Sequence, residues 1–521
     1  MRKNGVLLHI TSLPSKYGIG TMGKEAFNFI DFLKRSHQQL WQVLPLGPTS
    51  YGDSPYQSYS TFAGNPYLID LDLLAEDGLL KPEEYEDLEW SESDDAVDFG
   101  RLYTLRYKVL DKAVARFLKN PAADYQKFLE EEKDWIDDYA LFMALKDKHE
   151  GKPWLEWESE YRKYDAKKAE AWKEEFKDRM DYYKVLQYLF YKQWRAVREY
   201  ASKNFVQIIG DLPIYVAQDS VDAWSNPELF IFDEDGRPSL VAGCPPDGFS
   251  ADGQLWGNPI YDWKYHKKTG YEWWIRRVQH ATEVYDILRI DHFRGFDSFY
   301  AIPADATTAK VGEWLEGPGL DLFTTIEGKL GKKAIIAEDL GYLTPSVKKL
   351  LADTGYPGMK VLEFAFDSRD GSGAEYLPYN YPKNCVAYAG THDNDTIRGW
   401  FESISPEDKQ YACDYMDAYN PNEYNWEMMR AVIASPADTT IVQAQDLLNL
   451  DSSARMNTPG RLGGNWTWRL KPNQINTEDI EGTLRWVTDL YGRGYGVNKP
   501  KKVEKDDDYT TMVQEIVNAK D

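Results

Sequence analysis

The chain has 521 residues, of which 28% are charged and 14% aromatic, and its formal net charge is −24 at pH 7. A charge this negative argues against general affinity for nucleic acid or anionic membranes, since both carry negative charge themselves. Its apolar runs are shorter than the ~18 residues of a membrane span, and Cys244, Cys385 and Cys413 show no CxxC spacing, so we expect a soluble cytoplasmic protein with a neutral or small-molecule substrate.

Short runs rich in Val, Ile and Leu recur along the chain and predict eight β-strands. Their nearly continuous apolar character is typical of strands buried on both faces, as in a parallel sheet. Helical patterns alternate with these runs. This alternation favours the α/β class and a closed (β/α)8 TIM barrel over an open doubly wound sheet. The runs lie at residues 5–10, 39–45, 206–212, 285–291, 333–339, 359–364, 385–391 and 439–446.

Two segments between the predicted strands illustrate the helical pattern. In residues 23–36, Phe27, Ile30 and Leu33 fall on one helical face. In residues 343–355 we expect Thr344 to cap the helix start, Pro345 to occupy its first turn and Gly355 to follow its end.

The segment between the second and third predicted strands is far too long for a loop, because βα connections usually span about 2 to 6 residues. Helix-like runs at 101–120, 138–149 and 181–204 indicate a helical insertion there. We therefore expect a catalytic barrel over 1–497, interrupted by an aromatic loop (46–67), a helical insertion (68–200) and a loop or lid subdomain (212–284), and followed by a charged tail (498–521).

Acidic side chains follow several of the predicted strands. The carboxyl ends of barrel strands form one rim, where active sites of such barrels lie. Carboxylates that converge there raise one another's pKa and require nearby cations or hydrogen-bond donors. The acidic residues are Asp211, Asp291, Glu338, Asp339 and Asp393, and the candidate cations are Arg289, His292, Arg294 and His392.

Such a site can keep one carboxylate ionised as a nucleophile and another protonated as a general acid, which is the division that glycosidic bond cleavage requires. Each residue also has a simpler interpretation. A single Asp or Glu at a strand end often caps a helix or pairs with arginine, and His292 or His392 can be a hydrogen-bonded core histidine. No HxH or HxxxH spacing occurs among the histidines, so we expect no metal and no other cofactor.

Two loops rich in Gly, Pro and aromatic residues add candidate substrate contacts. Residues 51–67 include Tyr59, and residues 243–263 include Trp256. Irregular loops at a barrel rim often carry binding residues, and aromatic faces suit stacking on sugar rings. The alternative is that these rings only pack the loops against the protein.

Five motifs in chain order resemble the 4-α-glucanotransferase family, also called amylomaltase or disproportionating enzyme, glycoside hydrolase family 77. They are GDLPIYV, RIDHFRGF, AEDLG, GTHDNDT and QDLLNL…RMNTPG…NWTWR. The resemblance runs from HITSLPS to NWTWRL, over about nine tenths of the chain. It implies an α-amylase-like barrel with subdomains inserted in its loops.

The resemblance also implies roles for individual residues. Asp291 would be the nucleophile, Glu338 the general acid and base, and Asp393 the carboxylate that binds sugar hydroxyls and stabilises the transition state. The residues implied to support substrate binding are Asp211, Arg289, His292, His392, Tyr59, Trp256 and Asn457, and Arg469 lies in a matching C-terminal motif. One departure is the loop with Arg461 and Leu462, where the family commonly has a Thr-led segment, which leaves acceptor preference open.

The implied reaction cleaves α-1,4 bonds of maltodextrins and transfers the glucanosyl unit to the 4-hydroxyl of glucose, maltose or another glucan. It needs two carboxyls about 5 to 5.5 Å apart, an ionised Asp291 beside Arg289 and a raised pKa at Glu338. From the residues alone, a retaining amylase-like hydrolase is equally compatible, and a non-catalytic glucan-binding scaffold is a further alternative. The sequence leaves the oligomeric state open, including a homodimer.

Overall fold

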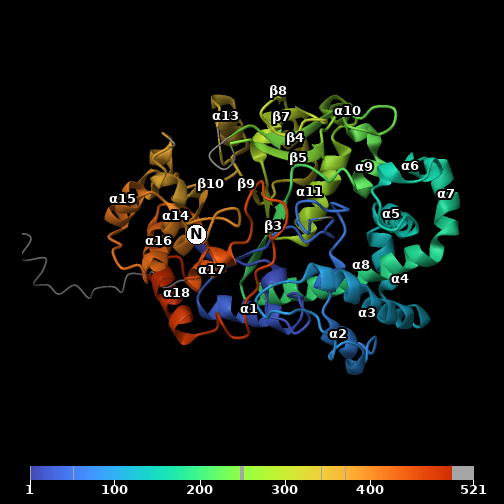
Figure 1. Ribbon diagram of the computed structural model, residues 1–521, viewed down its shortest axis with the longest axis horizontal. Helices are drawn as coiled ribbons and strands as arrows, with labels where there is room; N and C mark the ends of the chain where they lie inside the picture. The colour runs from blue at the N-terminus through green and yellow to red at the C-terminus, as the bar shows by residue number, and fades with distance from the viewer. Residues whose placement is uncertain (1, 51, 247–250, 342, 370, 496–521) are drawn as a thin grey trace, which may run out of the picture.

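The structure is a computed structural model that describes residues 2–50, 52–246, 251–341, 343–369 and 371–495. The predicted charged tail at 498–521 and part of the 243–263 loop lie outside the described residues. Figure 1 shows a central sheet surrounded by helices, with a smaller sheet at one end.

The eight predicted strands are all present and form one parallel sheet in the order β10-β11-β12-β1-β2-β3-β6-β9. The two ends of this order meet where the Ala337 N–H donates to the Pro357 carbonyl at 2.9 Å. The predicted (β/α)8 barrel is therefore confirmed. Its strands are β1 (Lys3–Leu7), β2 (Leu40–Gln42), β3 (Gln207–Leu212), β6 (Ile287–Ile290), β9 (Ile335–Ala337), β10 (Gly358–Val361), β11 (Cys385–Tyr388) and β12 (Thr439–Gln443).

The barrel strands are buried on both faces, which explains their continuous apolar runs. Ile336 packs in one cluster with Leu7, Leu40 and Ile441 from other strands of the barrel. Its neighbour Ile335 packs in the larger cluster with residues of the surrounding helices, because successive strand side chains point to opposite faces.

The two helices examined in the sequence are present. α1 (Lys24–Arg35) buries Ile30 and Leu33, while Phe27 is only partly buried. α13 (Pro345–Thr354) begins after Thr344, whose side chain accepts from the Val347 N–H, and ends at Gly355 with φ 67°, as predicted.

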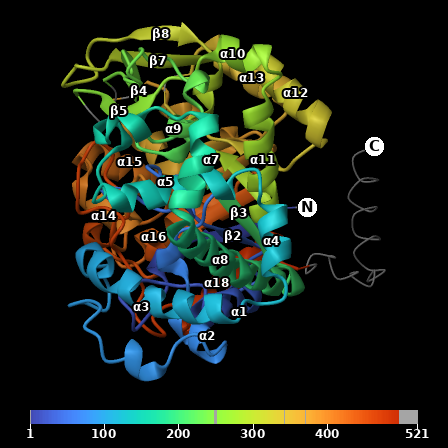
Figure 2. The same cartoon turned by 90° about the vertical axis from the view of Figure 1, so that its right-hand side faces the viewer.

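The long segment between β2 and β3 forms helices, as predicted. Figures 1 and 2 show α3 to α8 gathered on one side of the molecule. The last of them, α8, packs on α5 and α3 and also on the barrel helix α1, and it leads directly into β3. These helices are α2 (Leu71–Glu76), α3 (Phe99–Lys119), α4 (Tyr125–Glu131), α5 (Ile136–Lys148), α6 (Ser159–Arg162), α7 (Ala166–Glu175) and α8 (Lys177–Lys203).

A second, antiparallel sheet was not predicted. Its order is β5-β4-β7-β8, and its strands come from both sides of β6 in sequence. Two of them, β5 and β8, have several exposed or partly exposed side chains, so no continuous apolar run marks them in the sequence. The strands are β4 (Leu240–Cys244), β5 (Gln254–Pro259), β7 (Ser298–Pro303) and β8 (Glu313–Glu316).

The remaining helices follow β3 in the chain. None of the helices in the described part of the chain is both long enough and apolar enough to cross a membrane. They are α9 (Val221–Ser225), α10 (Trp263–Lys268), α11 (Glu272–Val284), α12 (Leu320–Leu330), α14 (Ile397–Ser403), α15 (Pro406–Met416), α16 (Tyr424–Ala434), α17 (Ala444–Leu447) and α18 (Glu478–Leu490).

Candidate active site

The parallel register brings three of the predicted acidic residues to adjacent strand ends. β3 and β6 pair Asp211 with Arg289, and Asp291 and Glu338 follow β6 and β9 directly. The Asp291 N–H donates to the Leu212 carbonyl at 3.0 Å, and the Glu338 N–H donates to the Ile290 carbonyl at 3.0 Å. Backbone hydrogen bonds therefore fix both residues at the rim of the barrel.

Arg289 links a buried carboxylate to an accessible one. Its Nη1 lies 2.6 Å and 2.7 Å from the two Asp211 carboxylate oxygens and 2.9 Å from Asp291 Oδ1. The Asp211 and Arg289 side chains are 0% and 3% exposed, whereas the Asp291 side chain is 26% exposed. The buried Asp211 carboxylate therefore holds the Arg289 guanidinium beside the accessible carboxylate of Asp291.

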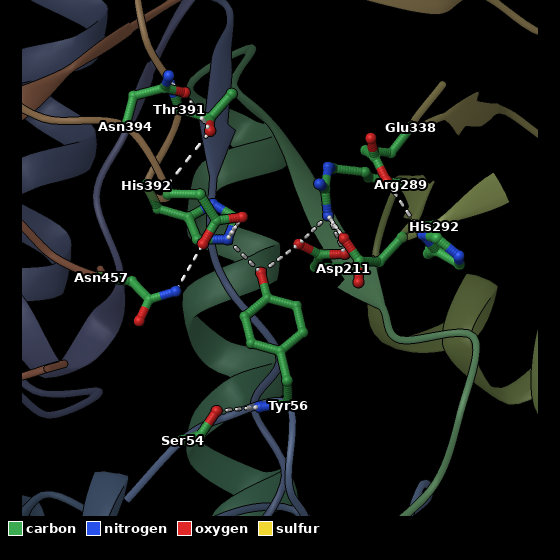
Figure 3. Close-up of polar contacts among 12 residues, drawn as sticks. Ser54, Tyr56, Asp211, Arg289, His292, Glu338, Thr391, His392, Asn394 and Asn457 are labelled. Carbon is green, nitrogen blue, oxygen red and sulfur yellow. Dashed lines mark hydrogen bonds and ion pairs between the residues drawn. The ribbon is translucent and has the colours of Figure 1, made fainter. Parts of the chain in front are cut away.

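Glu338 is oriented by two backbone donors. Its Oε2 accepts from the His292 N–H at 2.7 Å, and its Oε1 accepts from the Leu340 N–H at 2.8 Å. His292 has a left-handed backbone with φ 52°, which is costly for a side chain larger than glycine. This conformation turns the N–H next to Asp291 toward Glu338, as Figure 3 shows.

Burial raises the pKa of Glu338, as we expected, while Arg289 and the two backbone hydrogen bonds oppose that rise. Burial also raises the pKa of Asp291 well above its usual range, and Asp211 and Glu338 add to this against the opposing effect of Arg289. Burial and the neighbouring carboxyls therefore oppose the ionisation of Asp291, while Arg289 favours it. The two carboxyls act as one coupled site that binds a proton more readily than either would in water.

On the other side of the site, Tyr56 connects Asp211 to His392. Its Oη donates to Asp211 Oδ2 at 2.8 Å and lies 2.8 Å from His392 Nε2, and the two rings stack with centroids 5.5 Å apart. Burial lowers the pKa of His392, which favours the neutral imidazole. Because the tyrosine hydroxyl donates to Asp211, we assign the His392 proton to Nε2. Figure 3 shows Tyr56 between the two.

Asp393 is held by the last of the predicted motifs. Its Oδ1 accepts from Asn457 Nδ2 at 2.7 Å, and its Oδ2 lies 3.4 Å from His392 Nε2. The Asn457 N–H donates to the His392 carbonyl, and Arg455 Nη2 donates to the Asp393 carbonyl at 2.6 Å. The Asp393 side chain is 37% exposed, so it is accessible beside its buried neighbour His392.

Trp256 and Tyr59 come from loops. The edge of Trp256 meets the His292 ring with centroids 4.8 Å apart. The Gln57 side chain donates to Asn258 Oδ1 at 3.1 Å and to the Trp256 carbonyl at 3.4 Å, which joins the two loops. Tyr59 instead lies against the helical insertion, where Lys146 Nζ is 4.8 Å from its ring centroid.

Three residues of the motifs have contacts that are structural. Asp339 Oδ1 accepts from the Met359 N–H at 2.6 Å and ties β9 to β10. Arg294 lies 3.9 Å from the Trp314 ring centroid in the antiparallel sheet. Arg469 donates to the Ser15 and Ser93 carbonyls.

The sequence did not single out Tyr56 or Arg455. Tyr56 stood among several aromatic residues of the 51–67 loop, and only that loop composition pointed to it. Arg455 lies near the RMNTPG motif, without a pattern of its own. Within the described ranges, no group of three or more His, Cys, Asp or Glu side chains is arranged to hold a metal ion.

A buried Asp–Arg pair, two coupled carboxyls and a third accessible carboxylate provide the groups that substitution at a sugar acetal requires. A family profile described as 4-alpha-glucanotransferase matches residues 8–476 of the chain. The chain is 48% identical to a 4-alpha-glucanotransferase of Clostridium butyricum over 488 residues, which is 93% of this chain and all of that protein. It is 46% identical to a 4-alpha-glucanotransferase of Streptococcus pneumoniae serotype 4 over 495 residues, covering 94% of this chain and 97% of the relative.

A solved structure is also similar over nearly the whole chain. It is the amylomaltase from Streptococcus agalactiae in complex with acarbose, with a TM-score of 0.92 and 46% sequence identity. The similarity covers 95% of this chain and 100% of that one.

Proposed function

The chain belongs to the 4-alpha-glucanotransferase family, glycoside hydrolase family 77, and from that premise we propose that it disproportionates maltodextrins. It cleaves an α-1,4 bond and transfers the glucanosyl unit to the 4-hydroxyl of glucose, maltose or a longer glucan. The observation that carries this proposal is that Arg289 forms ion pairs with both Asp211 and Asp291, next to Glu338 at an adjacent strand end.

In the first step, an Asp291 carboxylate oxygen attacks the anomeric carbon while Glu338 gives its proton to the departing glycosidic oxygen. The bond from the anomeric carbon to that oxygen breaks, and an ester to Asp291 forms. In the second step, Glu338 takes the proton of the acceptor 4-hydroxyl, whose oxygen displaces Asp291. Two inversions at one carbon retain the α configuration, and no cofactor takes part.

The coupled carboxyls suit this sequence of protonation states. Their raised pKa values favour one proton on the pair, and the reactive state places it on Glu338. Arg289, 2.9 Å from Asp291 Oδ1, stabilises the carboxylate that remains. When the ester forms, Asp291 loses its charge and the pKa of Glu338 falls, so Glu338 can act as a base and then recover its proton from the acceptor.

Asp393 is proposed to bind sugar hydroxyls and to stabilise the positive charge that develops on the sugar ring. Its Oδ1 bond to Asn457 leaves one oxygen near His392 and the accessible side of the site. His292, with its ring beside Trp256, and Tyr59 are proposed to line the sugar subsites, and the buried Asp211 and His392 are proposed to support them. The acarbose complex of the Streptococcus agalactiae relative supports α-glucan-like ligands for this site.

Incubation with maltotriose tests the proposal and separates it from the two alternatives. A transferase produces glucose and oligomers longer than maltotriose while the total of reducing ends stays constant. An amylase-like hydrolase raises that total with time, and a glucan-binding scaffold changes neither the products nor the total. A rise in reducing ends that matches glucose release would contradict the proposed function.

Finer expectations about the whole protein remain proposals. We propose a cytoplasmic location, from the cysteine pattern of the sequence, and the division into a 1–497 barrel with insertions at 46–67, 68–200 and 212–284. A homodimer is the oligomeric state that we propose to test first. Light scattering coupled to size-exclusion chromatography measures its mass directly, and a monomer mass at micromolar concentration would contradict it.

A further inference from the structure

Two buried carboxyls flank the loop that carries His392 and Asp393. In the sheet, β11 lies between β10 and β12, and residues 389–396 follow β11. Glu363, which is 4% exposed, lies just after β10, and Asp446, which is 1% exposed, lies in α17 just after β12. The two side chains therefore occupy the strand ends on either side of this loop.

Glu363 holds the first half of the loop. Its N–H donates to the Ala389 carbonyl at 3.1 Å, and its carboxyl faces the Asn394 side chain. A Cβ at Gly390 would lie only 2.7 Å from Glu363 Oε1, so the backbone of the loop passes directly over this carboxyl. The Asn394 Oδ1 in turn accepts from the N–H and the hydroxyl of Thr391.

Asp446 holds the other end. Its Oδ1 accepts from the Ile397 N–H at 2.8 Å, at the first residue of α14 after the loop. Its own carbonyl accepts from the Asn425 side chain at 2.7 Å. Asp446 thus fixes the loop end against α16, which contains Asn425.

Neither carboxyl has the partners that a buried charge requires. Glu363 Oε1 and Asp446 Oδ2 are both buried without a hydrogen-bond partner, and among the described residues neither side chain forms an ion pair. The charged groups that face Glu363 are Asp446, Asp395 on the loop, and Arg455 beyond the loop, and those that face Asp446 are Glu363 and Asp395. Three carboxyls against one arginine make joint ionisation costly.

We propose that Glu363 and Asp446 are positioning residues which, in their uncharged form, hold the loop 390–396 between the ends of β10 and β12 and so fix Asp393 in the site. This inference rests on the proposed function, because it assigns these residues their effect through Asp393. Burial raises the pKa of Glu363 well above its usual range and that of Asp446 to about 7. A rise in pH therefore charges the two carboxyls, which repel each other and loosen the loop.

The sign of the pH effect follows from these shifts. A carboxyl whose pKa is raised in the folded state stabilises that state below its unfolded pKa and loses this contribution as the pH rises through the folded pKa. For Asp446 that window runs from the ordinary carboxyl value to about 7. Glutamine and asparagine keep the shape of the uncharged acids but cannot ionise. The activity and stability of these variants relative to the wild type should therefore rise with pH.

The experiment compares Glu363→Gln, Glu363→Ala and Asp446→Asn with the wild type on maltotriose, between about pH 5 and pH 9. The variant-to-wild-type ratio of kcat is the readout, because the titration of Asp291 and Glu338 cancels in it. At low pH, Glu363→Gln should keep kcat within about threefold, and Glu363→Ala should lose about 100-fold in kcat with little change in KM. The ratio for Glu363→Gln and Asp446→Asn should rise with pH.

Glu402→Gln is the matched control, since Glu402 lies on α14 with its side chain 58% exposed, and its ratio should stay near unity at every pH. A flat ratio for Glu363→Gln, a loss equal to that of Glu363→Ala, or full activity of Glu363→Ala would each overturn the inference. A wild type without turnover would contradict the proposed function instead. In that case, melting temperatures of Glu363→Gln and the wild type, measured across the same pH range, still test whether the uncharged carboxyls hold the loop. A constant difference between the two melting temperatures at every pH would overturn the inference.

Discussion

The carboxylates at the strand ends and the aromatic residues of the loops are held in position in different ways. Asp291 and Glu338 are fixed by backbone hydrogen bonds between adjacent parallel strands. Tyr59 is fixed from outside the barrel, where its N–H donates to the Pro48 carbonyl and its ring lies against Lys146 of α5. Groups that form and break bonds need tighter positioning than groups that bind a chain of sugars, and strands provide it.

The two regions also differ in the partners of their buried cations. Beneath Asp291, Arg289 and Asp211 form a buried pair whose energy depends on ideal geometry. Behind Tyr59, Lys146 is paired with Asp219 at 2.6 Å but presents its ammonium to an aromatic face. Changes to the strand-mounted region should therefore reduce kcat, whereas changes to the loop-mounted region should mainly raise KM.

Asp291→Asn should have the largest effect. The amide cannot form the ester, so turnover of maltotriose should fall by at least about 10,000-fold, while the melting temperature changes little. Asp305→Asn, which alters an exposed carboxylate, serves as the control and should behave as the wild type. Near-normal activity of Asp291→Asn would remove the basis for assigning chemistry to the strand ends.

Arg289→Lys should reduce kcat by about 100-fold. All three contacts are made by Nη1, and the lysine Nζ lies one bond nearer the backbone, so its ammonium cannot reach both Asp211 and Asp291 and one carboxylate loses its partner. The same loss should lower the free energy of unfolding by about 3 kcal/mol, measured by denaturant titration, because Asp211 is fully buried. A variant with unchanged kcat would show that the pair is structural only.

Tyr56→Phe should reduce kcat by about tenfold. The substitution removes the hydroxyl that donates to Asp211 and faces His392, while the ring stack remains. Initial rates at saturating maltotriose measure the effect. If KM rose while kcat stayed constant, Tyr56 would belong functionally with the loop region rather than with the carboxylates.

Lys146→Met should have the smallest effect, a rise in KM of about threefold with kcat nearly unchanged. Methionine keeps the apolar contact with Tyr59 but removes the ammonium. Lys148→Met is the matched control, because Lys148 Nζ lies 4.4 Å from the Tyr161 ring centroid within the same insertion. Equal KM values for both variants would indicate that Lys146 does not position Tyr59.

The same contrast decides what could be predicted from the sequence. Strands buried on both faces leave continuous apolar runs, so the eight barrel strands and the rim positions of Asp291 and Glu338 were predicted. Strands β5 and β8 have several exposed or partly exposed side chains and leave no such run. The family and the barrel are confirmed, and the roles of the individual site residues remain predictions.

Contacts between distant parts of the chain could not be predicted from the sequence. Tyr56 meets residues 155 and 336 positions away, and nothing local marks it among the aromatic residues of its loop. The left-handed backbone of His292 is set by the bond to Glu338 across two strands. The net rise in the pKa of Asp291 comes first from burial and then from carboxyls at three other strand ends, and the sequence predicted the effect of those carboxyls and of Arg289 but not the degree of burial.

Trapping the ester tests the central claim most directly. In Glu338→Gln, α-maltotriosyl fluoride can glycosylate the enzyme because fluoride leaves without a proton, but the second step lacks its base. Mass spectrometry of the digested protein should then show one maltotriosyl group on the peptide that contains Asp291. A sugar on any other carboxylate, or no adduct while fluoride is released in a rapid stoichiometric burst, would contradict the account.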